Sequence, residues 1–410
     1  MSESIFMNEI GIVSSIKNES PYIDEWIKYH MAAGVTKFYL YDNESDDDLK
    51  DILNPYIEKN IVEYTFFPGK CAQMPIFNDA IKKHRFDCRY LAFIDIDEFI
   101  YPKSSDNILD AVKDIMEFDK SAGGIRVNWY MFGSSGQESM DLTRGVLERF
   151  LYRAEKTDEN GKCIVNPRCV DFWQHAHNAY YYSGRYSINE RGRRMGPDEK
   201  DQDGTADKIV IHHYHTKSKE EWVRKKKLGD VYYESNPYLN KDGTVKWEMF
   251  EQSDRNEVYD NDILNYFEKI KSNSASVKND DAQFILKCLN KITELAEKDN
   301  VIVSMEEFLC YWHVCDKYMR KYLSEVTVSY FEEMLVKGLE KVLRNTHELW
   351  EFQLFLSVIP ELIRTSSKTK PIIIKYSKQI IPQIMNIYSK WENYREYCKY
   401  KRQLEWLEII

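Results

Sequence analysis

Several features that mark common protein classes are missing from this sequence of 410 residues. Its eight cysteines form no CxxC pair and no closely spaced set, which favours reduced thiols over a disulfide framework or a structural zinc site. The start, MSESIFMNEIG, has no secretory-signal pattern, and no run reaches the roughly 18 apolar residues of a membrane span. The net charge of -10 argues against broad nucleic-acid binding, because a phosphate backbone needs a basic surface. We therefore expect a globular cytoplasmic protein.

Short apolar runs alternate with helical patterns in the first third of the chain. The runs cover residues 10–16, 37–41, 61–67, 90–95 and 124–132. Between the first two, Ser20 and Pro21 suggest a helix N-terminus and Gly34 a helix end. A second helical stripe begins at Leu49. This order predicts an α/β sheet with mostly parallel strands.

The remainder of the chain divides into an irregular stretch and a helical one. Residues 136 to about 235 are rich in Gly, Asn, Pro and charge, and we interpret them as loops around one further strand at 208–215. From residue 255 onward the periodicity is helical, glycines are few, and no repeat of fixed length occurs. We predict two domains, an α/β domain at 1–254 and an all-helical domain at 255–410.

The last part of the helical stretch is locally basic. Between Arg364 and Arg402 there are ten Lys or Arg residues against two Glu residues. The aromatic residues toward the end of this stretch include Trp391, Tyr394, Tyr397 and Tyr400. This pattern predicts either a solvated helix face, which is the more common case, or peripheral contact with the inner face of an anionic membrane.

The strongest chemical motif is RYLAFIDIDEFIYP at residues 89–102. An apolar run that ends in carboxylates predicts a buried strand whose C-terminal end opens into a crevice. If the strand continues, Asp95 and Asp97 share one face. A divalent cation such as Mn²⁺ or Mg²⁺ would relieve their repulsion and leave coordination positions for diphosphate oxygens. The alternative is an acidic strand end that only caps the next loop.

Polar residues also follow the first two runs. Lys17, Asn18 and Glu19 come after the first run, and Asp42 after the second. The carboxyl ends of parallel strands meet at one edge, so these side chains are predicted to face the same crevice as Asp95 and to contact a nucleobase and ribose. Each of them is, by itself, more often a turn or cap residue.

Three histidines lie at the end of the run at 208–215. Strand alternation places His213 and His215 on one face and His212 on the other, so a zinc site of protein ligands alone is disfavoured. We predict that a single histidine of this group completes a carboxylate and phosphate shell around Mn²⁺ and that Lys217, next to it, offsets phosphate charge. A satisfied core histidine is the competing interpretation.

Taken together, these motifs resemble the family 92 glycosyltransferases of the GT-A superfamily, which have a Rossmann-like nucleotide-diphospho-sugar transferase domain. The resembling segments are KNESPYIDEWIKYHMAAGVTKFYLYDNES, IVEYTFFPG, LAFIDIDEF, NWYMFGSSG, ERF and HHYHTKSKEEWVRKKKLGD, in family order over residues 8 to 230.

The resemblance implies a metal-dependent inverting enzyme. It would move a sugar, with galactose favoured, from a UDP-sugar to a glycan or lipid-linked saccharide. It also implies that Asp95 and Asp97 bind the metal and diphosphate, that Asp42 contacts uracil, and that His213 completes the metal shell. Eukaryotic members carry a membrane anchor before the catalytic domain. Because no such segment is visible here, we expect a bacterial enzyme of surface polysaccharide or glycan synthesis.

Inversion by one in-line displacement needs a carboxylate base opposite the leaving diphosphate. Glu148 is the first candidate, followed by Asp171 and Glu138, although Glu148 could instead pair with Arg149 or Arg153 on a helix. Residues near the end of the fifth run, together with the GSSG turn that resembles a family element, are candidates for a sugar platform, with core packing as the competing fate. They are Trp129, Tyr130, Phe132 and Ser134.

Two other functions compete with sugar transfer. The DID segment could begin an aspartate phosphotransferase signature, but Glu98 and Phe99 occupy positions where that chemistry wants small or hydroxyl residues. A non-catalytic scaffold that binds glycan or nucleotide is the other alternative, and it is disfavoured by the presence of Asp95, Asp97 and His213.

Overall fold

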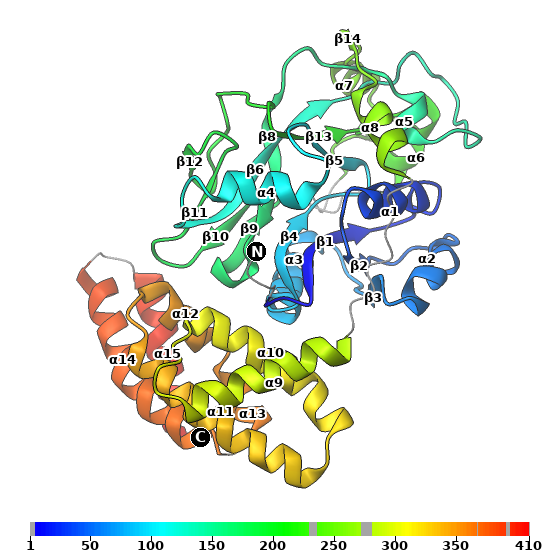
Figure 1. The fold of residues 1–410 in the computed structure, drawn as a ribbon. Coiled ribbons are helices and arrows are strands. Elements are labelled where there is room, and N and C mark those ends of the chain that lie inside the picture. Colours follow the sequence, from blue (N-terminus) through cyan, green and yellow to red (C-terminus); the bar gives the residue numbers. More distant parts are fainter. Residues whose placement is uncertain (1–4, 229–235, 272–280, 367, 391–393, 410) are drawn as a thin grey trace. The chain divides into compact units, whose positions relative to one another are not determined.

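The computed structural model describes residues 5–228, 236–271, 281–366, 368–390 and 394–409, which form two compact units (Figure 1). The sheet unit contains residues 8–181 and continues from 185 to the boundary after residue 277. It therefore extends beyond the boundary predicted at 254. The reason is helix α8 (Asp262–Ile270), which buries Ile263, Tyr266 and Ile270 in the same core as the sheet.

One end of the main sheet is formed by the four strands that the sequence predicts first. They are β1 (Asn8–Ile16), β2 (Lys37–Asp42), β3 (Val62–Phe66) and β4 (Cys88–Phe93). All pair in parallel in the order β3-β2-β1-β4. The chain winds outward from β1 to β3 and then returns to the other side of β1. This Rossmann-like order confirms the predicted α/β class and places a topological switch point between β1 and β4.

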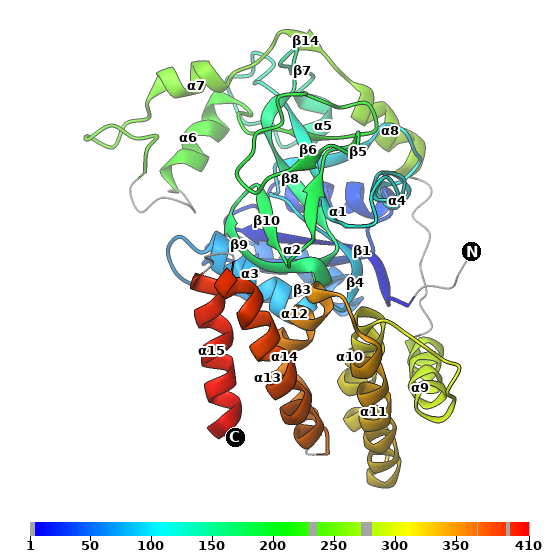
Figure 2. The same cartoon turned by 90° about the vertical axis from the view of Figure 1, so that its left-hand side faces the viewer.

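Helices cover both faces of this sheet (Figures 1 and 2). On one face, α1 (Ile23–Ala32), α2 (Leu49–Glu58), α4 (Ile108–Met116) and α8 contribute to one core. On the other face lie α3 (Gln73–His84) and the hairpin of β9 (Val170–His175) and β10 (Asn178–Tyr181). Strand β1 sends Ile10 and Ile12 to the first core and Val13 to the second. Its run is continuous and apolar because both faces are buried.

The prediction of one further strand after residue 136 is wrong. Besides the predicted β13 (Ile209–His213), this stretch forms β7 (Tyr152–Arg153), β8 (Asp158–Val165), the β9–β10 hairpin, β11 (Tyr186–Ile188) and β12 (Arg194–Met195). Strand β8 pairs antiparallel with both β4 and β6 (Ala122–Met131). Its first half, DENGK, has no apolar alternation, and Lys162 is buried there because it forms an ion pair. Because of these polar residues, the sequence pattern does not indicate a strand here.

Helix α1 begins later than predicted. Tyr22 occupies the cap position, while the Ser20 amide donates to Oδ2 of Asp47 at 3.0 Å. Ser20 therefore links the loop after β1 to the loop after β2 and does not cap the helix. The predicted helix end is confirmed, since Gly34 follows at a φ of +99° that suits glycine.

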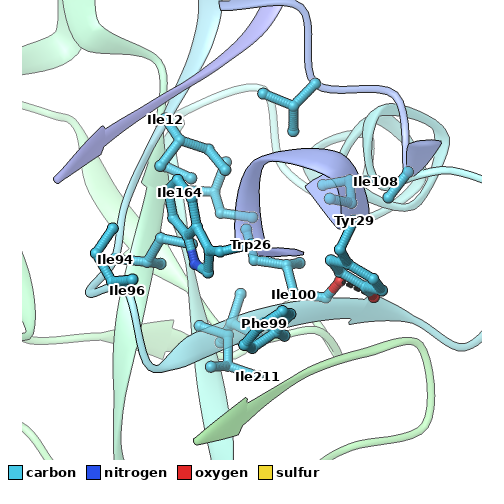
Figure 3. Close-up of a cluster of buried hydrophobic side chains, with 14 of the residues drawn as sticks. Ile12, Trp26, Tyr29, Ile94, Ile96, Phe99, Ile100, Ile108, Ile164 and Ile211 are labelled. Atoms are coloured by element: carbon cyan, nitrogen blue, oxygen red, sulfur yellow. Dashed lines mark hydrogen bonds between the residues drawn. The ribbon is translucent and has the colours of Figure 1, made fainter. Parts of the chain in front are cut away.

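Helix α1 also covers the outer edge of β5 (Glu98–Pro102), which pairs with β13 on its other edge (Figure 3). The Trp26 indole donates to the Glu98 carbonyl at 2.8 Å, and the Tyr29 hydroxyl donates to the Ile100 carbonyl at 2.7 Å. The Ile100 amide donates in turn to Nε2 of His30 at 3.3 Å. These bonds satisfy an otherwise open strand edge and fix the turn that precedes β5 against α1.

The second unit is helical, as predicted. Its helices are α9 (Asp281–Glu297), α10 (Met305–Tyr322), α11 (Glu325–Asn345), α12 (Leu349–Ser357), α13 (Ile359–Thr365), α14 (Lys370–Lys390) and α15 (Tyr394–Ile409). Among the described residues, no helix is long and apolar enough to cross a membrane. Tyr400 is buried against Tyr388 and so does not belong to a basic surface face, and Trp391 lies outside the described residues.

Candidate active site

A cavity of about 720 Å³ opens at the carboxyl ends of β1, β2 and β4. Its lining comes from the loops after these strands and from β8, the β9–β10 turn, the end of β13 and helix α6 (Lys219–Lys227). The volume suits a nucleotide-sized ligand, and its position at the switch point is where open α/β sheets bind ligands.

The end of β1 and the loops after β1 and β2 form the first wall of the cavity, which consists of Ser15, Lys17, Glu19, Asn43 and Glu44. Of the nucleotide-binding residues predicted here, Lys17 and Glu19 line the cavity. Partial burial of Glu19 raises its pKa, opposed by Lys217 and Lys225.

Two predicted residues of this wall are placed elsewhere. Asn18 lines a small adjoining pocket of about 20 Å³, and its Oδ1 accepts the Asp46 amide at 2.9 Å. Asp42 is buried outside the lining, and its carboxylate accepts the Tyr64 hydroxyl at 2.6 Å and the Ser45 amide at 2.9 Å. Asp42 is the last residue of β2, and its contact with uracil stays a prediction.

Asp95 and Asp97 both line the cavity, but not as neighbours on one strand face. Strand β4 ends at Phe93 and β5 begins at Glu98, so the two carboxylates lie in the turn between two strands. Asp95 accepts Nζ of Lys162 at 2.8 Å and Nε2 of Gln73 at 3.1 Å. The alternation expected for a continuous strand does not apply to this turn.

Asp97 is nearly enclosed, with 3% of its surface exposed. Its Oδ2 pairs with Nζ of Lys225, and its Oδ1 lies 3.6 Å from Nε2 of His213. Burial alone would raise the pKa of Asp97, but Lys225 and His213 hold it well below the usual range. The carboxylate is therefore ionised at neutral pH and available as a ligand.

Asp97 forms a cluster with His213 and His215, in which one ligand atom from each lies within 4.8 Å of the others. As alternation predicts, His213 and His215 line the cavity, while His212 packs against Phe132 on the other side. Burial, reinforced by Lys226, lowers the pKa of His215 well below its usual value and keeps the ring neutral. One carboxylate and two imidazoles form a donor set that fits a divalent transition metal. Asp95 lies in the same cavity but outside this cluster, and its role as a metal ligand stays a prediction.

Helix α6 brings two unpredicted lysines to the cluster. Its capping box joins Ser218 and Glu221, and the Glu221 carboxylate accepts the Arg149 guanidinium at 2.7 and 3.0 Å. One turn later, Lys225 reaches Asp97, and Nζ of Lys226 lies 3.1 Å from Nε2 of His215. The i, i+4 spacing from the capping glutamate to Lys225 is a sequence signal that could have identified it.

Lys217 does not line the main cavity. It borders the small adjoining pocket, with its Nζ 4.4 Å from the centre of the Tyr22 ring. Burial lowers the pKa of this amine, with Asp97 opposing the shift. Within the described residues, the lysines that line the cavity are Lys17, Lys70, Lys162, Lys225 and Lys226.

The second wall consists of Trp129, Lys162, His175, His177, His213, His215, Lys225 and Lys226. The Trp129 ring lies between His213, at 4.6 Å, and His177, at 5.1 Å, measured between ring centroids. Nδ1 of His177 is 2.9 Å from the Gly161 carbonyl oxygen. Burial together with Lys162 lowers the pKa of His177 to about 3, so this ring is neutral at neutral pH.

Only Trp129 of the predicted sugar platform lies in this wall. Tyr130 points to the other face of β6, where Arg153 lies 3.8 Å above its ring, and Phe132 is buried between His212 and Tyr214. Ser134 is 2% exposed, and its amide donates to Asp254. Neighbouring residues of a strand face opposite ways, so Trp129 and Tyr130 could not both reach the cavity.

None of the three predicted base residues is part of the cavity lining that the structure describes. Glu148 is exposed on α5 (Val146–Arg149), whose first amides bind the Glu25 carboxylate. Glu138 pairs with Lys219 at 2.7 Å, and Asp171 is half-buried on β9. The alternative pairing for Glu148 is also wrong, because Arg149 binds Glu221 and Arg153 binds Asp260. Residue spacing alone does not show which way the side chains of this short helix point.

Curated relatives match parts of the chain. A glycosyltransferase family 92 protein of Ricinus communis is 28% identical over 165 residues, covering 40% of this chain and 30% of that protein. A galactan beta-1,4-galactosyltransferase of Arabidopsis thaliana is 30% identical over 114 residues, covering 25% of this chain and 22% of that protein. The chain spans about 30% of the length of the first of these relatives.

Solved structures show only distant likeness. Staphylococcus aureus TarS bound to UDP is 12% identical, covering 82% of this chain and 89% of that chain with a TM-score of 0.30. The galactosyltransferase LgtC, bound to donor and acceptor sugar analogues, is also 12% identical and covers 59% and 94%, with a TM-score of 0.26. At these TM-scores, neither likeness supports the assignment of a family to this chain.

The sequence model described as Glycosyltransferase family 92 matches residues 13–274. This range includes every residue that lines the cavity and ends close to the boundary of the sheet unit. It covers more than half of the 410 residues. The chain therefore belongs to glycosyltransferase family 92.

Proposed function

We propose that this protein transfers a sugar from a nucleoside diphosphate donor to a hydroxyl group of a saccharide acceptor. The observation that carries the proposal is the cavity at the switch point, where the cluster of Asp97, His213 and His215 lies beside the lysines of the lining. An anionic donor and a developing diphosphate charge require such a concentration of cations. Membership of family 92 supports sugar transfer.

The two walls give the donor an orientation. In a Rossmann-like half-sheet, the nucleoside binds over the carboxyl ends of the first strands, so we assign it to Lys17, Asn43 and Glu44. The diphosphate then lies toward Asp97 and Lys225, and the sugar toward Trp129 and His177. UDP-galactose is the donor we favour, because a relative that matches part of this chain is a galactosyltransferase.

Asp97, His213 and His215 would hold the divalent cation that the resemblance implies. Once bound, such an ion supplies Lewis-acid charge to diphosphate oxygens. Two imidazoles among three ligands favour Mn²⁺ over Mg²⁺, which prefers an all-oxygen shell. Lys225 contributes a second positive charge beside the Asp97 carboxylate, and Lys162 holds Asp95 in place.

Inversion requires a base on the face of the sugar opposite the diphosphate. Asp95 and Asp97 are already paired with lysines, and Glu44 is assigned to the nucleoside, so among the described lining residues Glu19 is the remaining carboxylate candidate in place of Glu148 and Asp171. Glu19 is our first candidate, because partial burial raises its pKa toward the range useful for proton transfer. The cytoplasmic, membrane-peripheral and pathway assignments stay predictions from the sequence.

The proposal is tested by measuring UDP released from a panel of UDP-sugars with saccharide acceptors and Mn²⁺. We expect UDP-galactose to be consumed, and Mn²⁺ with UDP to raise the melting temperature of the wild type but not of Asp97→Ala. GDP and CMP serve as controls for recognition of the nucleobase. The proposal fails if no nucleotide shifts the melting temperature and no sugar nucleotide is consumed.

A further inference from the structure

Behind the metal cluster, one buried carboxyl group faces one buried ring nitrogen. Glu98 and His213 are register partners in the antiparallel pair β5–β13, so their side chains share a face of the sheet. Oε1 of Glu98 lies 3.8 Å from Nδ1 of His213, and the two residues are 0% and 7% exposed. Within the described part of the chain, neither atom has a hydrogen-bond partner. Nζ of Lys162 lies 3.9 Å from Oε1, which is an ion-pair distance and not a hydrogen bond. Buried polar atoms without a hydrogen bond destabilise a fold, so the pairing requires an explanation.

The remaining atoms of both side chains have fixed roles. Oε2 of Glu98 accepts the Asp95 amide at 2.9 Å, which orients the carboxyl group. Nε2 of His213 faces Oδ1 of Asp97 at 3.6 Å, on the side of the cluster. His213 therefore presents Nε2 to the cluster and Nδ1 to Glu98. Histidines that bind a metal usually donate their second ring N–H to a carboxylate or carbonyl, which fixes the tautomer.

We propose that Glu98 is a positioning residue for His213. It accepts the Nδ1–H of His213 and so leaves the Nε2 lone pair free for a divalent cation held with Asp97 and His215. The gap of 3.8 Å exceeds a normal hydrogen bond by about 1 Å, which a small rotation of the ring closes. The inference rests on the proposed function only because both require a divalent cation at the cluster of Asp97, His213 and His215.

Glu98→Gln tests this role with almost no change in shape. If the amide oxygen keeps the bond to the Asp95 N–H, the NH₂ group faces Nδ1 of His213 and can only donate. Nδ1 must then accept, the ring proton moves to Nε2, and the metal loses its ligand. We expect the affinity for Mn²⁺ to fall about 10- to 100-fold, measured from the electron paramagnetic resonance signal of free Mn²⁺ in titrations with and without UDP.

Glu190→Gln is the matched control. Glu190 is 2% exposed, and its carboxylate accepts the amides of Asp207, Lys208 and Ile209 where the chain enters β13, outside the cavity lining. This variant should lower stability but leave Mn²⁺ affinity unchanged. Equal Mn²⁺ affinity in wild type and Glu98→Gln, equal losses in both variants, or no Mn²⁺ binding by the wild type would each overturn the proposal.

Histidine ¹⁵N spectra of the protein loaded with diamagnetic Zn²⁺ provide a second measurement. We expect His213 to carry its proton on Nδ1 in the wild type, and an Nε2–H tautomer would contradict the proposal. Neither measurement uses catalysis. A wild type that binds Mn²⁺ as expected but consumes no sugar nucleotide would refute the proposed function and leave the role of Glu98 standing.

Discussion

The two walls of the cavity are built in different ways. The first wall comes from the loops after β1 and β2, where short segments leave neighbouring parallel strands. The second wall takes its side chains from β6, β8, the β9–β10 turn, β13 and α6, which are far apart in sequence. The first wall has one lysine, Lys17, and no histidine, whereas the second gathers four histidines and three lysines.

This difference separates recognition from chemistry. Loops that leave adjacent parallel strands have fixed positions and suit the recognition of a nucleoside. Charge stabilisation needs groups that converge from several directions, and long-range pairing of β13 with β5 and β6 provides them. We therefore expect substitutions in the second wall to reduce catalysis far more than substitutions of the nucleoside contacts Lys17, Asn43 and Glu44 in the first wall.

The largest effect is expected for Asp97→Asn compared with Glu44→Gln. Both changes convert a lining carboxylate to an amide of nearly the same shape. Asp97→Asn removes a ligand of the proposed metal and leaves Lys225 without its partner, so kcat/KM should fall at least about 100-fold. Glu44→Gln should lower it less than about 10-fold, mainly through KM. Initial rates of UDP release measure both, and equal losses would show that the metal cluster, in which Asp97 joins His213 and His215 of the second wall, contributes no more to catalysis than the first wall.

The parts of the first wall could be predicted because their determinants are local. Apolar runs and glycine signals identify β1 to β4, and strand order then brings Lys17 and Glu19 to the edge that lines the cavity. The second wall depends on pairings that no local pattern shows. Lys162 lies in a strand without apolar alternation, and Lys225 reaches Asp97 only because Glu221 and Arg149 fix the start of α6.

The next effect concerns stability in acid, which we expect both halves of the sheet unit to share. His30, on α1, and His212, on β13, are enclosed, and burial lowers the pKa of each to about 3. In the unfolded chain both bind a proton near pH 6.5. The unfolded state therefore binds more protons between pH 6.5 and 3, and stability falls as the pH is lowered through this window.

At pH 5 each of these histidines should cost about 2 kcal/mol of unfolding free energy relative to neutral pH. His212→Phe, which places an apolar ring among Phe132 and Tyr214, should remove its share of this loss. Urea-unfolding midpoints at pH 7 and pH 5 measure the change. Replacing the exposed His347 by Gln should leave the loss of stability between pH 7 and pH 5 as in the wild type. An unchanged acid loss in His212→Phe would contradict the assignment.

The smallest effect tests whether the first half of the sheet unit holds the turn that carries Asp97. Trp26→Phe removes the indole N–H that donates to the Glu98 carbonyl. Trp173→Phe makes the same change in the other core, where the indole N–H has no hydrogen-bond partner among the described residues. Both variants lose packing, so the difference between their unfolding free energies isolates the hydrogen bond, at about 1 kcal/mol.

If α1 also positions the turn, Trp26→Phe should weaken Mn²⁺ binding several-fold while Trp173→Phe should not, because only the Trp26 indole donates to β5. Equal Mn²⁺ affinity in the two variants would mean that β13 alone fixes Asp97 through the bond from the Tyr214 amide to the Asp97 carbonyl, at 2.8 Å.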